Sequence, residues 1–471
     1  MDALLASYFA QRGGYDFRSL LYDAQMKRLL LLLFLFLLAA CSDPPVLDIK
    51  IVVPPGDDPL KGVDVVRLHV TDPAVDKNFQ VTDPDQINIE VEVAVESAAG
   101  VITLEGAAAG KIQARGETPP VLLVPEAGSL SLLVARAGVT SKLGPELKLA
   151  SLDMASLLLP SLGVFFASGK QASIYDFFTH EVKALPAPPE SRIGAVAAPC
   201  GNRCITLALG KAGTTLAKTL ISYDGAAWTA FSDGLDDLSR RAGAATAPLG
   251  DGTYVVAGGV DAKGAALDTL LHLDPGSTSS VPGMRKLSSR SAAARAAPVA
   301  AGSGGHALIA GAGKAEVFSL TSLASQAVTL PGVAPHTGAA ICALSDGAFL
   351  LVGGADAGGK TLRDVWRVDP KTLKVTHYKD ALASGRQGHA ALQVAGRLVV
   401  LGGKGDGAMA AKMELLDATT LKAVTNADQA VQRAGVRANR LGPGSVLISG
   451  GVDSAGAAVT SLEVYQRDTP L

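Results

Sequence analysis

Aromatic residues, cysteines and runs of like charge are scarce in this sequence. Phe, Tyr and Trp make up 5% of the chain, which holds only two tryptophans and four cysteines. Exposed aromatic rings are a common platform for sugars, so this scarcity argues against binding by sugar stacking. The 42 basic residues nearly balance the 44 acidic ones, for a net charge of -2. Because nucleic-acid binding needs a basic patch or stripe, we predict no nucleic-acid partner.

Sequence motifs of catalysis are also missing. No GxSxG elbow, HExxH pair or paired metal-ligand spacing occurs. Four histidines of the second half share no common motif: His306, His336, His377 and His389. We therefore predict no cofactor and no metal, and we predict that the protein is not an enzyme.

The one long apolar run is too short to span a membrane. It covers Leu29–Leu38, follows Met26-Lys27-Arg28 and precedes Ala39-Ala40-Cys41. A spanning helix needs about 20 apolar residues. A basic start, a short apolar middle and small residues at its end predict a secretory signal peptide over 26–40. Residues 1–25 carry no targeting pattern and are predicted to be a non-native upstream extension.

The end of this run resembles the lipobox of bacterial lipoproteins. The matching residues are Leu38-Ala39-Ala40-Cys41, and in that family the cysteine is diacylated and becomes the mature N-terminus. The resemblance implies lipidation of Cys41, an anchor and linker over 41–45, and attachment to a membrane through the lipid. It also implies a place in the bacterial cell envelope, with the outer membrane or cell surface favoured.

Alternating apolar and polar residues predict a first β domain over 46–150. Val66, Leu68 and Val70 alternate with polar residues, as expected for a strand with one buried face. Six to eight short strands in roughly 100 residues are typical of an immunoglobulin-like β-sandwich. The aspartates of its turns could bind calcium, but Asp-Pro turns explain them without a metal: Asp57, Asp58, Asp83 and Asp85. His69 lies on a polar strand face and is expected to be solvated.

The second half of the chain contains an internal repeat. Short strands open with Arg-x-Gly or a close variant at intervals of 46 to 50 residues, and small residues, often a glycine pair, follow each opening. The openings are Arg192, Arg241, Arg290, His336, Arg386 and Arg433. A repeat of this length without helical periodicity predicts a ring or stack of small sheets.

The repeat resembles the kelch motif. Arg241-Ala242-Gly243 opens one unit, Tyr254–Ala257 runs to Gly258-Gly259, and Leu270–Leu273 ends at Asp274. The resemblance covers 159–471 and implies an all-β β-propeller of four-stranded blades, seven favoured and six as the alternative. The ring is expected to close by pairing strands from both ends. Kelch repeats usually carry a Tyr and a Trp each, whereas this chain has only Trp228 and Trp366.

Two cysteines flank a predicted hairpin turn. Cys200 and Cys204 enclose three residues where the other repeats have their first hairpin, so the thiols should face each other. An oxidising compartment favours a disulfide between them. A zinc site would need two more ligands, and no His or Cys is near in the sequence. Cys342 lies in an apolar first strand and is expected to be a buried thiol.

One stretch matches the P-loop expression letter for letter. Gly354–Thr361 reads GADAGGKT, but a P-loop must open a helix whose amides hold the phosphates. Residues 362–368 read as a strand instead. We therefore predict no nucleotide partner.

The repeat geometry places the opening residues at one rim of the ring. Because the first two strands of each unit are antiparallel, the opening arginine and the glycine pair lie at the same end, with four loop aspartates beside them: Asp261, Asp356, Asp406 and Asp453. Either these charges pair with one another and close the ring, or some guanidinium groups stay free for an anionic ligand. All ten residues are candidate ligand-binding positions.

These patterns favour a lipid-anchored binding or scaffold protein of the cell envelope that presents a propeller face to a protein or glycan. The alternative is an envelope enzyme that acts on a sugar or acidic sugar at the channel mouth. A purely structural envelope component is the third possibility. A deep pocket with clustered His, Tyr and carboxylates would favour the enzyme, and a broad shallow face would favour binding.

Overall fold

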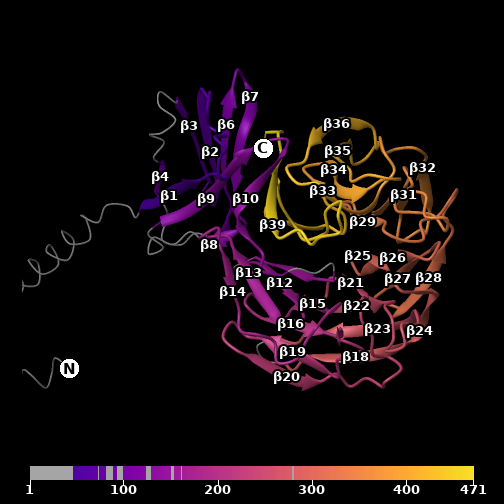
Figure 1. Cartoon of the computed structure of the whole chain (residues 1–471). Coiled ribbons are helices and arrows are strands. Elements are labelled where there is room, and N and C mark those ends of the chain that lie inside the picture. The colour runs from indigo at the N-terminus through magenta and orange to yellow at the C-terminus, as the bar shows by residue number, and fades with distance from the viewer. Residues whose placement is uncertain are drawn as a thin grey trace, which may run out of the picture.

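The computed structural model describes residues 46–72, 74–80, 89–92, 99–122, 129–149, 153–160, 162–277 and 280–470. These residues form strands, turns and loops, with no helix among them (Figure 1). Within this part of the chain there is accordingly no helix long and apolar enough to cross a membrane. The predicted extension 1–25, the signal peptide 26–40, the linker 41–45 with Cys41, and Asp83 and Asp85 all lie outside the described residues.

The N-terminal part is one curled sheet of seven strands, in the order β3-β2-β6-β7-β9-β1-β4. The strands are β1 (Val46–Val52), β2 (Val65–Thr71), β3 (Ala74–Gln80), β4 (Ile89–Glu92), β6 (Ile102–Ala108), β7 (Lys111–Glu117) and β9 (Ser129–Arg136), and β5 (Ala99–Gly100) pairs separately with β8 (Val121–Leu122). Strand β9 pairs with β1 through its first half, in parallel, and with β7 through its last residues. The immunoglobulin-like sandwich stays a prediction, because the described strands of this part form one seven-stranded sheet and the short β5–β8 pair.

The predicted alternation in β2 is confirmed. Val66, Leu68 and Val70 are almost fully buried, whereas Arg67 and His69 are not. The three buried side chains join an apolar cluster on the concave side of the sheet, together with Ile102 and Leu104. Burial of one face fixes the register of the strand, because a slip by one residue would expose all of these side chains.

The rest of the described chain forms seven four-stranded antiparallel sheets. Their strands are β10 (Thr140–Glu146), β39 (Ser461–Gln466), β38 (Ser445–Ser449) and β37 (Arg437–Arg440); β11 (Ala155–Leu159), β12 (Gly163–Ser168), β13 (Gln171–Asp176) and β14 (Val182–Ala184); β15 (Val196–Pro199), β16 (Ile205–Ala208), β19 (Thr219–Tyr223) and β20 (Trp228–Ser232), with a small ribbon of β17 (Lys211–Ala212) and β18 (Thr215–Leu216); β21 (Ala245–Pro248), β22 (Tyr254–Ala257), β23 (Leu267–Asp274) and β24 (Gly283–Arg295); β25 (Val299–Ser303), β26 (His306–Gly311), β27 (Lys314–Ser319) and β28 (Ala324–Val328); β29 (Ala340–Ala343), β30 (Phe349–Val352), β31 (Val365–Val368) and β32 (Val375–Tyr378); and β33 (Gln387–Val394), β34 (Arg397–Lys404), β35 (Lys412–Asp417) and β36 (Ala423–Asp428).

The sheets follow one another around a ring (Figure 1). Strand β11 contacts β15 and β37, β25 contacts β21 and β29, and β33 contacts β29 and β37. We call β11, β15, β21, β25, β29, β33 and β37 the innermost strands. The arrangement is compatible with a β-propeller.

The ring is closed by a strand from the N-terminal side of the repeats. Thr140 and Ser141 of β10 pair with Tyr465 and Val464 of β39, so this sheet combines residues about 320 positions apart. The boundary that the sequence suggested at 150 therefore needs correction, because β10 belongs to the ring. The predicted start at 159 also moves, since β11 supplies the first strand of the sheet that contains 163–176.

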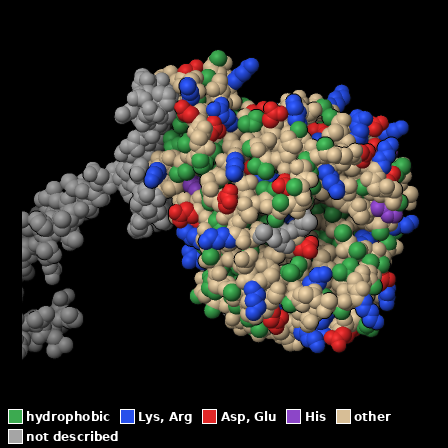
Figure 2. All heavy atoms as spheres, in the orientation of Figure 1, with side chains coloured by type: hydrophobic (Ala, Val, Ile, Leu, Met, Phe, Trp, Pro, Cys, Tyr) green, Lys and Arg blue, Asp and Glu red, His purple; other side chains and the backbone are tan. Residues whose placement is uncertain are grey.

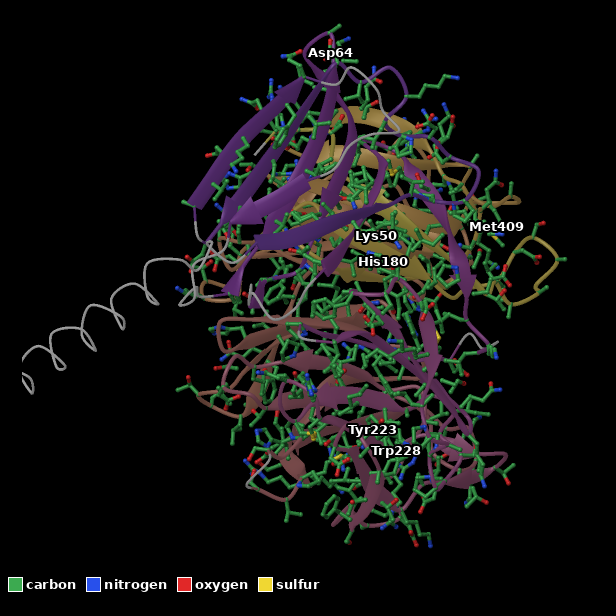
Figure 3. All side chains as sticks on the ribbon, turned by 90° about the vertical axis from the view of Figure 1, so that its left-hand side faces the viewer. Lys50, Asp64, His180, Tyr223, Trp228 and Met409 are labelled. Atoms are coloured by element: carbon green, nitrogen blue, oxygen red, sulfur yellow. A yellow bond between two sulfur atoms is a disulfide. The ribbon has the colours of Figure 1, made fainter. Side chains whose placement is uncertain are left out.

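The N-terminal sheet packs directly on the ring. Alternate residues of β9 point to opposite sides: Leu132 and Val134 join the cluster inside the curled sheet, whereas Leu133 and Ala135 join a cluster that includes Leu447 of the ring. His180 lies at the level where the two parts meet (Figure 3), and its Nε2 is 3.1 Å from the carbonyl oxygen of Ser131. One strand thus contributes to both cores and ties the two parts together.

The structure contains a disulfide between Cys200 and Cys204 in the turn that joins β15 to β16, with the two Cα atoms 4.9 Å apart. Cys342, on β29, is a buried free thiol, as its apolar neighbours in the sequence predicted. Burial raises its pKa to about 12, so this thiol stays protonated and unreactive at neutral pH.

Candidate functional site

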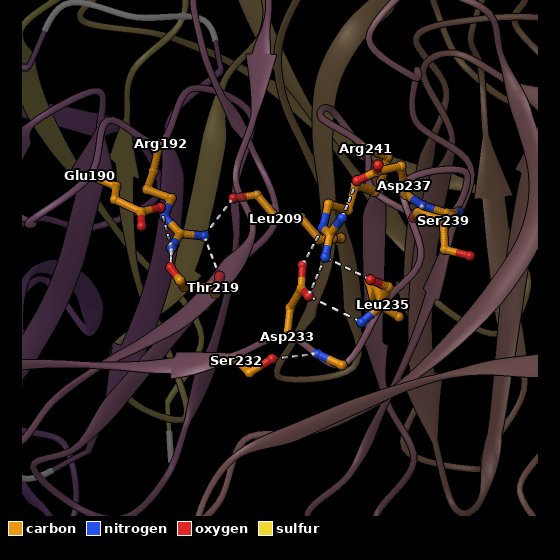
Figure 4. Close-up of polar contacts among 12 residues, drawn as sticks. Glu190, Arg192, Leu209, Thr219, Ser232, Asp233, Leu235, Asp237, Ser239 and Arg241 are labelled. Carbon is orange, nitrogen blue, oxygen red and sulfur yellow. Dashed lines mark hydrogen bonds and ion pairs between the residues drawn. The ribbon is translucent and has the colours of Figure 1, made fainter.

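The opening arginines are buried within their own sheets. Arg192 and Arg241 have no exposed surface. Nη1 of Arg192 donates to the carbonyl oxygens of Leu209 (3.1 Å), which directly follows the second strand, and Thr219 (2.8 Å), which begins the third (Figure 4). The planar guanidinium thus fastens two strands of one sheet through fixed hydrogen bonds, a geometry that suits arginine better than lysine.

The same bonds recur around the ring. Nη1 of Arg241 donates to Gly258 O (3.1 Å) and Thr269 O (2.7 Å), and Nη1 of Arg433 donates to Gly450 O (3.2 Å) and Ser461 O (2.8 Å). Nη1 of Arg386 is bonded in the same way to Gly402 and Lys412. The alternative in which guanidinium groups stay free for an anionic ligand is therefore wrong at these four positions. Backbone carbonyl oxygens already accept their hydrogen bonds.

Glutamates supply the counter-charges of three of these arginines, whereas Arg241 has Asp268 and Asp236 as its acidic neighbours. Glu463 lies 2.8 Å from Arg433, Glu190 lies 3.2 Å from Arg192, and Glu414 pairs with Arg386. Desolvation by burial is the largest influence on these guanidinium groups and lowers the pKa of each, for Arg241 to about 10. The prediction that arginines and loop aspartates pair with one another is thus corrected: the partners are glutamates and backbone carbonyls.

Arg290 does not occupy the position that the repeat assigned to it. It lies on the outer strand β24 with its side chain 63% exposed, and it pairs with Asp268 at 2.8 Å. Arg295 takes its place: this side chain is buried, donates from Nε to Gly311 O (3.1 Å), and pairs with Glu316 at 2.6 Å. The triplet could not decide between the two positions, because both Arg290-Ser291-Ala292 and Arg295-Ala296-Ala297 lack its glycine. The separation of 16 residues from Arg295 to Gly311, equal to that from Arg386 to Gly402, is the signal that could have found it.

His336 fills an opening position without a guanidinium group. Its backbone N–H donates to Ala355 O (2.7 Å), and its ring is packed so closely on Gly313 that a Cβ there would lie 2.6 Å from Nε2. The imidazole is half-buried. Its role is to pack against the adjacent sheet.

Three of the four loop aspartates shape their own loops, and the fourth, Asp406, binds the loop of the neighbouring sheet. Oδ1 of Asp261 accepts the backbone N–H groups of Lys263 and Ala265, both at 2.8 Å. Asp356 and Asp453 repeat this pattern in the corresponding loops, and Asp406 accepts Thr361 N–H at 2.7 Å. Carboxylates engaged in this way hold the turns in place.

The glycine of the Arg-x-Gly triplet links neighbouring sheets at this rim. Gly243 N–H donates to Gly194 O (2.9 Å), Gly388 N–H to Gly338 O (2.7 Å), and Gly435 N–H to Gly388 O (2.7 Å). Gly194 has a φ of +68°, and a Cβ there would lie 2.8 Å from Gly243 N. Only glycine satisfies both the positive φ and the close approach.

The innermost strands carry very little charge. Their seven segments contain mostly Ala, Val, Leu, Ser and amide residues, and the two charged side chains among them are Arg437 and Arg440, both on β37. Many of these positions are accessible to solvent, including every residue of β25. Both arginines are exposed. The centre of the ring is therefore accessible, nearly neutral and locally cationic.

Three other features of the described residues bear on function. No group of three or more His, Cys, Asp or Glu side chains in this part of the chain is arranged to hold a metal ion. The stretch that matches the P-loop is a loop followed by β31, so the predicted absence of a helix there is confirmed. A pocket of about 240 Å³ lies beside the disulfide on the outer part of the ring and is lined by Arg203, Asp224 and Phe231 among others.

Comparisons with known proteins give little further information. No protein-family model matches the chain, and no curated protein matches it. Among solved structures, one described as "Structure of YjhT" is similar, with 16% sequence identity, coverage of 68% of this chain and 95% of that chain, and a TM-score of 0.43. At this TM-score the likeness carries no functional information.

Proposed function

We propose that this protein is a lipid-anchored binding or scaffold protein of the bacterial cell envelope, built on a seven-bladed kelch-like propeller. The observation that carries the proposal is the use of the repeated residues. The opening arginines and loop aspartates are engaged in bonds within the ring, so the repeats build a rigid frame. Such frames commonly carry their binding residues on the loops between strands.

The loops next to the glycine pairs are the proposed binding face. Residues 262–266, 357–360 and 454–457 are exposed and follow the second strands of three sheets. These loops carry both signs of charge, because Lys263 lies in the same loop as Asp261 and Lys360 in the same loop as Asp356, which fits a protein or glycan partner better than a polyanion. Positive and negative side chains are likewise intermixed on the face of the molecule seen in Figure 2.

Membrane attachment is tested by Cys41→Ala in the full-length chain. We expect the variant to leave the membrane fraction or to remain unprocessed, because the acylated thiol is lost. Cys342→Ala is the matched control, since that thiol is buried in the ring, and it should stay in the membrane fraction. Unchanged mass and membrane partition for Cys41→Ala would refute the lipoprotein assignment.

The binding face is tested by Lys263→Glu combined with Lys360→Glu, both in exposed loops at the rim of the glycine pairs. Crosslinking in intact cells, followed by mass spectrometry, should show loss of the partner captured by the wild type while the melting temperature is unchanged. Lys371→Glu with Lys422→Glu is the control: these exposed residues lie after the third strand, at the opposite rim. Equal capture by both double variants would contradict the assignment of the face.

An envelope enzyme acting on an acidic sugar is the second candidate. The observation in its favour is the pair of exposed arginines in the otherwise neutral innermost strands. These strands hold no carboxylate that could serve as an acid or base, so binding remains the better-supported function.

A further inference from the structure

The centre of the ring is positively charged at one strand only. The seven innermost strands include no Asp, Glu or Lys, and Arg437 and Arg440 occupy the two ends of β37. Walls of small neutral side chains do little to screen a charge, so the field of an arginine placed there extends into the opening. The cationic character therefore comes from β37 alone.

Arg437 lies directly inside the rim formed by the triplet glycines. It follows Gly435, whose N–H is bonded to Gly388 of the neighbouring sheet. Its Nε donates a long hydrogen bond to Met154 O (3.4 Å), and the two terminal nitrogens make no hydrogen bond or ion pair with any described residue. This differs from Arg192, Arg241, Arg386 and Arg433, whose terminal nitrogens are all engaged.

The surroundings of Arg437 combine exposure with enclosure. The side chain is exposed to solvent, yet desolvation is the main influence on its guanidinium and lowers the pKa, with a smaller opposing effect from Asp153. Solvent exposure and a lowered pKa occur together when a side chain contacts water on one side and protein on the others. Charge-assisted hydrogen bonds are stronger in such a place than on an open surface.

Arg440, at the other end of the same strand, is already engaged. Its Nε donates to Gly442 O and its Nη2 to Pro443 O, both at 3.1 Å. It has the same charge and is likewise exposed. It is therefore the natural control for Arg437.

We propose that the centre of the ring binds the carboxylate of a small molecule, with the terminal nitrogens of Arg437 as its ligands. A guanidinium fork matches a carboxylate in shape and charge. One free cation with an acidic neighbour suits a monoanion, whereas a phosphate dianion would keep an unpaired charge. The inference goes beyond the proposed function, because it concerns the centre of the ring and not the loop face. It rests on the ring architecture and is independent of the lipid anchor.

The test is isothermal titration of the full-length chain at constant ionic strength with three probes: sodium glucuronate, glucose and inorganic phosphate. We expect glucuronate to bind the wild type and Arg440→Gln, and to bind Arg437→Gln at least about tenfold more weakly, since a hydrogen bond to a charged group is lost. Glucose should not bind. Equal binding of glucuronate by wild type and Arg437→Gln, no binding by the wild type, or preference for phosphate would overturn the proposal.

A second measurement avoids any substitution. Phenylglyoxal modifies accessible arginines, and peptide mapping resolves each site. Glucuronate should slow the modification of Arg437 in the wild type and leave that of Arg440 unchanged. Equal rates with and without glucuronate would overturn the proposal even if Arg437→Gln fails to fold. Both measurements can be made on Cys41→Ala protein, so a failure of membrane anchoring is seen separately.

Discussion

At the scale of single residues, the molecule depends on charges held inside its sheets. A buried arginine that is bonded to carbonyl oxygens cannot lose its partners without leaving several buried polar groups unsatisfied. Arg241 and Arg290 illustrate the difference, because the sequence treats them alike and the structure buries the first and exposes the second. The two positions therefore form a matched pair.

Arg241→Lys should lower the free energy of unfolding by about 3 kcal/mol or more, the scale of breaking a buried charged network. Lysine retains the charge but cannot reach Gly258, Thr269 and Ser239 with a single fork of donors. Urea denaturation gives the value. Arg290→Lys, on the exposed outer strand, should change it by less than about 1 kcal/mol. Equal losses of unfolding free energy in Arg241→Lys and Arg290→Lys would contradict the inference that the buried Arg241 side chain holds two strands of its sheet together.

His389 makes stability depend on pH. This side chain is buried between neighbouring sheets, and desolvation, together with the Arg386 guanidinium, lowers its pKa to about 3. Below the ordinary value near 6.5 the unfolded chain takes up a proton that the folded chain does not, so stability falls as pH drops from about 6.5 toward 3. The slope from one such group is at most about 1.4 kcal/mol per pH unit.

His389→Gln should therefore flatten the pH dependence of unfolding between pH 6.5 and 4. Denaturation midpoints at several pH values measure this, and the comparison with wild type cancels the contributions of the other histidines. An identical slope in His389→Gln and wild type would show that His389 takes up its proton in the folded state too.

At the scale of elements, the glycines that open each repeat set the spacing between neighbouring sheets. The bond from Gly243 N–H to Gly194 O joins the start of β21 to the start of β15, and it exists because nothing larger than hydrogen projects from Gly194. Two effects act at this position, the positive φ and the close approach. They can be separated experimentally.

Gly194→Ala should destabilise the protein by about 1 to 3 kcal/mol, the cost of a strained backbone, with an additional loss from the displaced Gly243. Gly264→Ala isolates the first effect, because Gly264 has a φ of +83° and no atom within 4 Å of a built Cβ. Thermal unfolding of both variants gives the comparison. If Gly194→Ala lowers the stability no more than Gly264→Ala does, the close contact between the two sheets adds no cost of its own.

At the scale of the whole molecule, β10 joins the N-terminal part to the ring. Leu143 of β10 is buried in the cluster that includes Leu447 and Leu462. Trp228 and Trp366 both lie in the ring, so their fluorescence reports its unfolding. A substitution in β10 should therefore shift the unfolding transition that is measured by the fluorescence of these two tryptophans.

Leu143→Ala should lower the midpoint of the tryptophan transition, by the roughly 2 to 5 kcal/mol typical of such truncations. Leu68→Ala makes the same change in the cluster of the curled sheet and should affect the tryptophan signal less. Denaturant titrations followed by fluorescence make the comparison. An unchanged tryptophan transition in Leu143→Ala would place β10 outside the ring's cooperative unit.

The sequence predicted what local pattern determines and missed what depends on distant pairing. Alternation identified the buried face of β2, and the repeated double glycines marked where second strands such as β22 end. The assignment of β10 to the ring is set by its register with β39, which no local pattern reveals. Arg437 could not be singled out either, because its position two residues after Gly435 in an ordinary strand says nothing about what surrounds it.

Pairing of β10 with β39 also means that the closing sheet can form only after nearly the whole ring has been synthesised. Strand β10 is synthesised before its partner β39, which lies some 320 residues later in the chain. At 5 to 20 residues per second, synthesis of that interval takes roughly 15 to 65 s. Throughout that interval its backbone is an unpaired edge that other chains could join. Lys142 and Glu146 stand on this strand with more than half of each side chain exposed even in the finished protein, and charges on a waiting edge discourage association. The contacts between β10 and β39 join residues far apart in the sequence, and such contacts form slowly. We therefore expect the slowest folding step to be the one that brings the two ends of the ring together.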